Sequence, residues 1–480
     1  MSDAVPASSQ SAGEAFKKAA WRGSTITLLG QGTSAVIRVG ANLVITRLLV
    51  PEHFGVMALV NVFLIGLHLF SDIGVGPNII QSPRGEDPAF LDTAWTVQVI
   101  RGAALWICSC LLAWPLAHFY GKPELVLLIP VAGLSALLGG FESTRLFTQN
   151  RQLAFFRVTA LDLGAQVASV VVMIVSAWFL RSVWALVISG LVSSLLRTIL
   201  SHTILPGHAN RFAWEPEARR SLFAFGRWIF ISTAITFLSS QSDRLVLGKL
   251  VPVEELGLYA IAANLASMPA QVIYQVTQKV FYPLLASALR SDTHDRASIL
   301  RSRARLLVLL APGIALGVAM APPVVAMLYD PRYVRVGSLT SLLSIGTWLS
   351  TVGSSYGIML LAAGHPRELS FGFALKVALF LGLTFVVAPR WGTAGLALLV
   401  ALSELGFFLV VFLAVKGRLR LTDLGADVGA TALGAAAVGG FLGVHALVLG
   451  ATGSPIVALS VVTVLGLAAT AALARKFRMI

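Results

Sequence analysis

Apolar residues gather along the chain in windows of about 20 residues, separated by short polar segments that often contain proline or glycine. A window of this length suits a helix that crosses the hydrocarbon core of a bilayer, and it is too long for a strand of a membrane barrel. The pattern predicts fourteen transmembrane helices, at residues 24–46, 55–80, 93–115, 124–148, 157–180, 182–204, 223–247, 256–285, 304–328, 336–363, 370–389, 391–415, 426–449 and 456–474.

The composition supports this reading. Of the 480 residues, 56% are hydrophobic and only 12% are charged, and the mean hydropathy is +0.82. A single soluble domain cannot hide so much apolar surface from water, and a disordered chain would be far more polar. The two cysteines, Cys108 and Cys110, show neither a metal-ligand spacing nor a disulfide framework. We therefore expect an all-α integral membrane protein without a metal or cofactor.

The basic residues predict an orientation. The chain has 36 Lys and Arg residues and a net charge of +14. When the N-terminus is placed in the cytoplasm, the cytoplasmic segments hold 24 of these cations, the opposite segments hold 7, and five lie within spans. This bias follows the positive-inside rule and puts both termini in the cytoplasm. Most of the positive charge thus serves to orient the chain in the membrane, and it gives no indication of nucleic-acid binding.

Two similar turns indicate an internal repeat. The segment RLLVPEHFG at 47–55 resembles KLVPVEELG at 249–257, so that Gly55 and Gly257 lie 202 positions apart. We expect two six-helix lobes of parallel topology, related by an axis along the membrane normal, around a central cavity. Such repeats are typical of alternating-access transporters; a duplicated fold without transport is the alternative. The expected organisation is an N-terminal tail (1–22), an N-terminal lobe (23–204), a basic cytoplasmic loop (205–222), a C-terminal lobe (223–415), and two further helices with a cytoplasmic tail (416–480).

Several motifs, taken as a set, resemble a known family. They are RLLVPEHFG (47–55), FSDIGVG (70–76), IIQ (79–81), DTAWTVQVIRG (92–102), SDRLVLG (242–248) and FYPLL (281–285). Over roughly residues 25–420 the chain resembles the polysaccharide-transporter flippases of the multidrug/oligosaccharidyl-lipid/polysaccharide exporter superfamily, in the branch of lipopolysaccharide and colanic-acid exporters.

The resemblance implies a transporter rather than an enzyme. Its expected activity is the transfer of undecaprenyl-diphosphate-linked oligosaccharides across the bacterial inner membrane, by alternating access, for lipopolysaccharide or exopolysaccharide biosynthesis. The expected partners are this lipid-linked oligosaccharide and membrane lipid, with polysaccharide polymerase or export machinery as further candidates.

Polar side chains inside the predicted spans are candidates for the substrate site, because an ionisable group at the bilayer centre costs about 2.5–3.5 kcal/mol. Arginine and lysine suit an anionic diphosphate, whereas amides and a tyrosine suit sugar hydroxyls. The candidates for the anionic headgroup are Arg38, Arg101, Arg244, Lys279 and Lys376. The candidates for the glycan are Asn42, Asn264, Gln271, Gln275, Gln278 and Tyr282. The alternative role for such side chains is polar contact between packed helices.

The energy source is expected to be a proton or sodium gradient, because the chain has no GxxxxGK[ST] nucleotide-binding loop. The candidate coupling carboxylates are Asp72, Glu142, Asp162, Asp243 and Glu404. Each also has a structural interpretation; Glu142, for example, is three residues from Arg145 and could form a pair on a helix surface.

Two other functions compete with the flippase. A multidrug exporter of the same superfamily would favour an acidic, aromatic cavity for cationic drugs, which disagrees with the intramembrane cations. A membrane enzyme of polyprenol-linked glycan assembly, such as a polymerase or ligase, commonly carries a large extramembrane loop. The longest loop here, at 204–223, is basic and too short to form a domain, and no catalytic constellation is visible.

Overall fold

A computed structural model describes residues 29–71, 74–152, 154–220, 229–276, 285 and 296–476. Within these residues the secondary structure is helical and contains no strand. Eight described helices are long and apolar enough to cross a membrane, or nine if one bent pair counts as a span. The chain is therefore an all-α, multi-pass membrane protein, as predicted. The total of fourteen spans stays a prediction.

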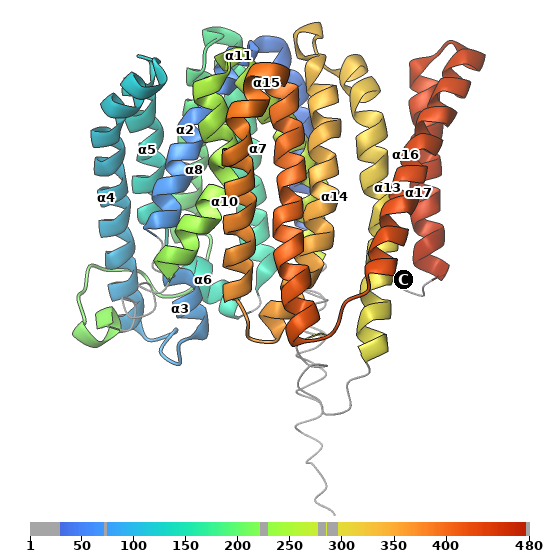
Figure 1. The fold of residues 1–480 in the computed structure, drawn as a ribbon. Coiled ribbons are helices and arrows are strands. Elements are labelled where there is room, and N and C mark those ends of the chain that lie inside the picture. The colour runs from blue at the N-terminus through green and yellow to red at the C-terminus, as the bar shows by residue number, and fades with distance from the viewer. Residues whose placement is uncertain are drawn as a thin grey trace, which may run out of the picture. The chain divides into compact units, whose positions relative to one another are not determined.

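The helix bounds follow the predicted windows closely (Figure 1). Residues 29–48 are helical. The elements after them are α2 (Pro51–Phe70), α3 (Val75–Gln81), α4 (Pro88–Tyr120), α5 (Leu125–Gly140), α6 (Arg145–Arg151), α7 (Phe155–Leu180), α8 (Trp184–Thr203), α10 (Ile229–Leu250), α11 (Val253–Val276), α13 (Arg296–Leu328), the short 3-10 helix η2 (Pro331–Tyr333), α14 (Arg335–Ala362), α15 (Arg367–Arg418), α16 (Leu424–Thr452) and α17 (Pro455–Lys476).

Local sequence explains where helices begin and turn. Helix α4 begins with Asp87, whose side chain accepts a hydrogen bond from the backbone N–H of Ala89, followed by Pro88 in the first helical position. Helix α15 contains two arms, because Gly392 adopts φ 53° and ψ −145° and reverses the chain. Only glycine adopts that backbone conformation without strain. The prediction of two helices, 370–389 and 391–415, agrees with these two arms.

Two predicted helices are broken. The window 55–80 divides into α2 and α3, and Gly74 at the break has φ 69°. The window 124–148 divides into α5 and α6, which bend by 57°. Both breaks fall in apolar windows that look continuous in sequence.

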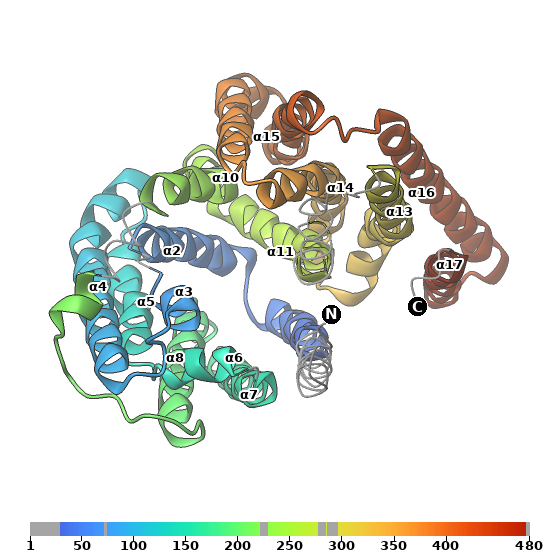
Figure 2. The same ribbon diagram turned by 90° about the horizontal axis from the view of Figure 1, so that it is seen from below.

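The chain divides into two compact units, one of Met1–Leu49 with Val60–Ala234 and one of Val50–Leu59 with Ile235–Ile480. In the first unit α4 packs on α5, and α8 packs on both α5 and α7; Figure 2 shows α4 and α5 side by side. Glycines allow the close approach of α4 and α5: a Cβ on Gly102 would lie 2.7 Å from the carbonyl oxygen of Ala136.

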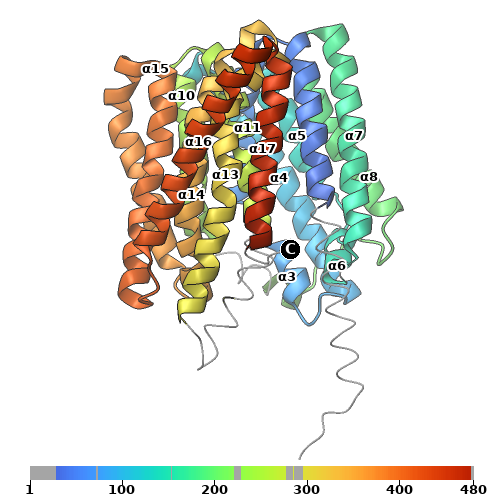
Figure 3. The same cartoon turned by 90° about the vertical axis from the view of Figure 1, so that its right-hand side faces the viewer.

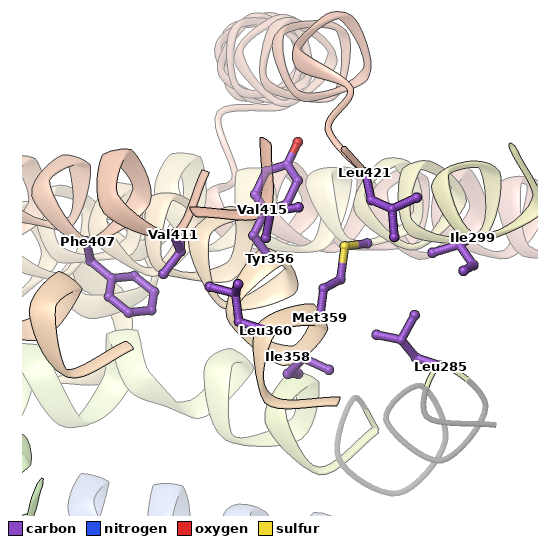
Figure 4. Close-up of a cluster of buried hydrophobic side chains, with 10 residues drawn as sticks. All are labelled: Leu285, Ile299, Tyr356, Ile358, Met359, Leu360, Phe407, Val411, Val415 and Leu421. Carbon is purple, nitrogen blue, oxygen red and sulfur yellow. The ribbon is translucent and has the colours of Figure 1, made fainter. Parts of the chain in front are cut away.

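In the second unit α13 packs against α14, α16 and α17. Figure 3 shows α16 and α17 beside α13. A cluster of buried apolar side chains joins α14 to the second arm of α15 (Figure 4). Tyr356 and Met359 of α14 meet Phe407, Val411 and Val415 of α15 there. The cluster joins the C-terminal ends of these two helices.

Candidate functional site

A cavity of about 320 Å³ lies inside the first unit, where α2 and α5 end. Apolar side chains and glycines form much of its wall. Its ionisable and amide lining residues are His68, Gln98, Arg101, Glu142 and Arg197. Two arginines and a glutamate thus give this cavity a charged, polar wall within a mostly apolar unit.

Side chains of α4 hold both helix breaks beside the cavity. The Arg101 guanidinium donates to the Ser71 hydroxyl (2.9 Å) and to the His68 carbonyl (2.8 Å) at the end of α2. One turn earlier, the Gln98 amide donates to the carbonyl of Gly139 (3.0 Å) at the end of α5. Carbonyls at a helix end need such donors, because no helical N–H reaches them. Gln98 and Arg101 of the motif 92–102 therefore stabilise the breaks that shape the cavity.

Arg197 connects two of the candidate coupling carboxylates. It lies 3.3 Å from Glu142 and 3.0 Å from Asp162. The pairing of Glu142 with Arg145 is wrong. Because the break between α5 and α6 separates them, the two residues share no helix face, and Arg145 instead donates to the carbonyls of His202 (2.6 Å) and Leu205 (3.0 Å).

The polar face of residues 29–48 is partly a helix–helix contact. The Ser34 hydroxyl donates to the Gln166 side chain (2.7 Å) on α7, and the Gln166 amide donates to the Ser34 carbonyl (3.1 Å). Arg38 is exposed and donates to Ser34 (2.9 Å). Asn42 is half-buried. Ser34 and Gln166 thus pack two helices together, while Arg38 extends beyond their contact.

A second polar cluster lies on α10 and α11 in the second unit. Arg244 donates to Gln241 (3.1 Å) and lies 3.5 Å from the Asn264 side-chain oxygen. The buried Tyr259 hydroxyl donates to one oxygen of Asp243 (2.5 Å). The other oxygen of Asp243 is buried and accepts no hydrogen bond within the described structure. The cluster brings together three of the candidates named from the sequence.

The polar face of α11 continues beyond this cluster. Asn264 and Gln271 are both exposed, and they lie seven residues apart on one helix face. The Gln271 amide lies within hydrogen-bond distance of the Ser267 hydroxyl (3.4 Å) between them.

Lys376 and Glu404 form an ion pair between the two arms of α15, with a distance of 2.6 Å. Their side chains are only 16% and 11% exposed. The sequence suggested separate roles for the two residues, and their spacing of 28 positions gave no signal of the contact.

Other candidates cannot be placed. Gln275 lies within α11, but its side chain is outside the described structure. Asp72, Gln278, Lys279 and Tyr282 lie outside the described residues altogether.

One buried ionic cluster is not among the candidates named from the sequence, because its arginine precedes the predicted span 304–328 by one residue. Arg303 of α13 is 1% exposed and lies 2.6 Å from Asp427 of α16. It also donates to the Ser355 hydroxyl (2.8 Å), and its guanidinium lies 3.6 Å from the centre of the Tyr356 ring. The Tyr356 hydroxyl donates to Asp427 (2.7 Å). We call these four residues the ionic pin, because they join α16 to α13 and α14.

The segment after α8 is fixed to the first unit as an extended strap (residues 206–215). Its backbone N–H groups at alternate positions donate to side chains of the motif 92–102, as expected for extended chain. Arg211 donates to Asp92 (2.9 Å), Ala213 to Thr96 (3.0 Å) and Glu215 to Thr93 (3.0 Å).

An ionic network holds the end of the strap. The Glu215 carboxylate lies 2.8 Å from Arg84, which also binds Asp87. The hydrogen bond from Arg84 holds the pKa of Asp87 below its usual range. The motif 92–102 therefore positions both the helix breaks and the strap. Within the described residues no group of three or more His, Cys, Asp or Glu side chains could hold a metal ion.

Comparison with known proteins gives a family. Residues 44–337 match a family described as polysaccharide biosynthesis protein. The lipopolysaccharide biosynthesis protein WzxC of Escherichia coli is 23% identical over 78% of this chain and 76% of its own length. The succinoglycan biosynthesis transport protein ExoT of Rhizobium meliloti is 23% identical over 69% and 67%. The teichuronic acid biosynthesis protein TuaB of Bacillus subtilis is 21% identical over 67% and 66%.

Solved structures share the fold. The lipid II flippase MurJ, in an inward closed conformation, has a TM-score of 0.67 and 13% identity, covering 94% of this chain and 98% of its own. An inward-facing multidrug resistance transporter of the MATE family has a TM-score of 0.60 and 15% identity, covering 79% and 94%.

Proposed function

The chain belongs to the family of polysaccharide biosynthesis proteins, and on that premise we propose that it moves lipid-linked oligosaccharides across the bacterial inner membrane by alternating access. The substrate class follows the relatives named for lipopolysaccharide and succinoglycan synthesis. The expected substrate is an oligosaccharide on undecaprenyl diphosphate, and both termini are expected in the cytoplasm. The multidrug exporter and the glycan-assembly enzyme are not favoured by the family.

The observation that carries the proposal is an arginine-centred polar cluster in each unit, at Arg101 and at Arg244. A diphosphate cannot cross hydrocarbon unpaired, because burying an isolated charge costs far more than any single contact returns. Arginine offers a planar fork of donors that matches phosphate oxygens. Beside Arg244, the exposed amides of Asn264 and Gln271 supply donors and acceptors for sugar hydroxyls.

Two apolar grooves along α16 suit the lipid part of such a substrate. One, of about 300 Å³, lies between α13, α14 and α16, and the other, of about 400 Å³, lies between α14, α15 and α16. Small residues of α16, such as Gly434 and Ala435, contribute to their walls. A polyprenyl chain would pack along these grooves by van der Waals contact while the headgroup is moved.

Asp243 is the candidate for ion coupling that the geometry favours among the described carboxylates. Glu142 and Asp162 are paired with Arg197, and Glu404 is paired with Lys376. One oxygen of Asp243 is buried and accepts no hydrogen bond from the described residues. A proton or a sodium ion would satisfy that oxygen, so that loading and release of the ion would change the local charge.

A deletion strain tests the function. We expect loss of a surface glycan and accumulation of lipid-linked repeat units, with both restored by the wild-type gene. Arg244→Ala should fail to restore export although the protein is inserted, whereas Arg332→Ala, a change at an exposed cation outside the clusters, should restore it. Normal glycan in the deletion strain, without a second copy of the gene, would refute the proposal.

A further inference from the structure

The strap carries exposed aromatic and basic side chains. Phe212 and Trp214 are 67% and 48% exposed, although large apolar rings gain free energy by leaving water. Arg211 is exposed beside them, and so are Arg219 and Arg220 in the helical turn that follows the strap. We call these five residues the strap patch, and all of them belong to the first unit.

The backbone of the strap holds the two rings at the surface. Three N–H groups at alternate positions of the strap donate to side chains of α4. In extended chain the side chains alternate between two faces, so Phe212 and Trp214 share one face. After the strap, Ala218 is 1% exposed and packs in an apolar cluster with residues of α3 and α4. The strap patch is therefore a fixed surface.

The strap patch is positively charged, because the acidic residues beside it are already paired. Glu215 and Glu217 lie 2.8 Å and 3.6 Å from Arg84. Within the part of the chain that the structure describes, none of the three arginines of the strap patch forms an ion pair with a carboxylate. The Arg219 guanidinium lies 5.8 Å from the centre of the Trp214 ring, a cation–π distance that leaves its N–H groups available to an anion.

Helix α4 shows the depth at which the strap patch lies. The Phe212 ring packs on Trp95 of α4, with 4.8 Å between ring centres. Trp114, which is 68% exposed, follows Trp95 by 19 positions in the same helix. At about 1.5 Å per residue the two lie about 28 Å apart along the helix, close to the thickness of about 30 Å of the hydrocarbon core. Because exposed tryptophan is typical of the boundary between hydrocarbon and headgroups, Trp114 marks one boundary and the strap patch lies at the other.

We propose that the strap patch binds the headgroups of anionic phospholipids, in the leaflet that the basic residues predict to be cytoplasmic. Its guanidinium groups offer planar forks of donors to phosphate oxygens, and its rings lie where headgroups join acyl chains. An acidic protein segment would match the charge but would leave Phe212 and Trp214 without an apolar partner. No residue of the strap patch lines the cavity beside Arg101, so this binding is separate from the proposed transport of substrate.

The first experiment measures lipid binding by the full chain. Native mass spectrometry of the protein in detergent, titrated with phosphatidylglycerol or with uncharged phosphatidylcholine, should show tighter binding of phosphatidylglycerol. Arg219→Gln should weaken that binding about fivefold, the effect expected of one cation at an anionic surface. Glutamine at all three arginines should weaken it at least about tenfold and leave binding of phosphatidylcholine unchanged.

The matched control is Arg181→Gln. Arg181 is also an exposed arginine beside exposed rings, those of Trp178 and Phe179, but it lies before α8 whereas the strap follows α8. This variant should bind phosphatidylglycerol as the wild type does. Equal losses from Arg181→Gln and Arg219→Gln, or no loss from the triple variant, would overturn the proposal.

The second experiment locates the lipid in a bilayer and keeps the arginines unchanged. In nanodiscs, the emission of the wild type minus that of Trp214→Phe isolates the fluorescence of Trp214. Phosphatidylglycerol with brominated acyl chains should quench this emission more strongly than brominated phosphatidylcholine at the same mole fraction, and high salt should reduce the difference by screening the charges. Equal quenching by the two lipids, or no quenching by either, would overturn the proposal.

A soluble peptide tests the other occupant. Hexaglutamate carries more negative charge than one phosphatidylglycerol molecule but has no acyl chain, so it should not displace the lipid when present at the same concentration. Displacement would assign the strap patch to an acidic protein segment and overturn the lipid site. None of these measurements contains an oligosaccharide, so their outcome does not depend on the proposed function.

Discussion

The ionic pin gives the sharpest test of how the last two helices are held. Arg303 and Asp427 are 1% and 5% exposed and 2.6 Å apart. Removing one partner of such a pair leaves an uncompensated buried charge, which costs about 3–5 kcal/mol. We therefore expect Arg303→Met and Asp427→Leu each to destabilise the second unit by that amount. At about 2–4 °C per kcal/mol for a domain of this size, each variant should lose about 6–20 °C in thermal midpoint.

The double variant separates the charge from the packing. When both partners become apolar side chains of similar size, no unpaired charge is left, and such replacements are often neutral or stabilising. Arg303→Met with Asp427→Leu should therefore lie within about 1–2 kcal/mol of the wild type, because only the hydrogen bonds to Ser355 and Tyr356 are lost. The coupling energy from the cycle of four proteins should exceed about 3 kcal/mol.

The assay is thermal unfolding in detergent, together with limited proteolysis that reports release of α16 and α17. Arg332→Met is the control, because its pair with Asp330 is exposed, and surface pairs contribute at most about 1 kcal/mol. A double variant as unstable as either single variant would show that the pair itself contributes net stability. Single variants with unchanged midpoints would show that the pin does not hold the tail helices.

Four further predictions address the clusters and the strap. Asp243→Asn should abolish gradient-driven export with little loss of thermal stability. Tyr259→Phe should keep export and lose about 1.5–3 kcal/mol of stability, because it removes a hydrogen bond to a buried carboxylate. Export in proteoliposomes and thermal midpoints check both, and full export by Asp243→Asn would exclude it as the coupling group. Arg101→Lys keeps the charge but lacks the planar fork that reaches both the Ser71 hydroxyl and the His68 carbonyl. We therefore expect glycan production to fall at least about tenfold, equal to about 1.4 kcal/mol. Wild-type glycan production by this variant would remove Arg101 from the site. Gln166→Leu should cost about 0.6–2 kcal/mol of stability and leave export intact, as for a helix–helix contact; lost export at normal stability would place Gln166 in the cavity instead. Asp92→Ala leaves the Arg211 N–H and the His208 ring without their acceptor, so the strap should become sensitive to trypsin at Arg211, and an unchanged cleavage rate would contradict its fixation by Asp92.

The spans could be predicted from sequence because each depends on a local property, the length of an apolar run. The breaks at Gly74 and between α5 and α6 could not, because the donors that stabilise them, Gln98 and Arg101, come from another helix. A helix break within the membrane is stable only when hydrogen-bond donors from elsewhere in the chain satisfy the carbonyl groups that the break leaves free. The local sequence does not show where those donors lie.

Unusual polar positions could be found in the sequence, but the partners of these residues could not. Polarity within a span marks a residue as unusual, and this was enough to select Arg101, Arg244, Asp243 and Lys376. The partner depends on how each helix is rotated about its axis, which no local pattern gives. Lys376 pairs with Glu404 between the two arms of α15, and Arg303 pairs with Asp427 at a separation of 124 positions. The repeat of Gly55 and Gly257 was visible in sequence, yet only the structure shows that its two copies touch.

The fixed strap has a consequence for the order in which the protein forms during synthesis. Among the described residues, the side chains that form hydrogen bonds with the strap, from Arg84 to Gln149, precede it in the chain. The ribosome has therefore delivered these partners of the strap before α10 is made, so the strap can pack early on the helices that precede it. The first turns of α2 are the exception, because Val253 and Tyr333 follow them by about 200 residues or more. These turns therefore have no packing partners during much of translation. We expect the membrane insertion machinery to cover them until the second half of the chain has been synthesised.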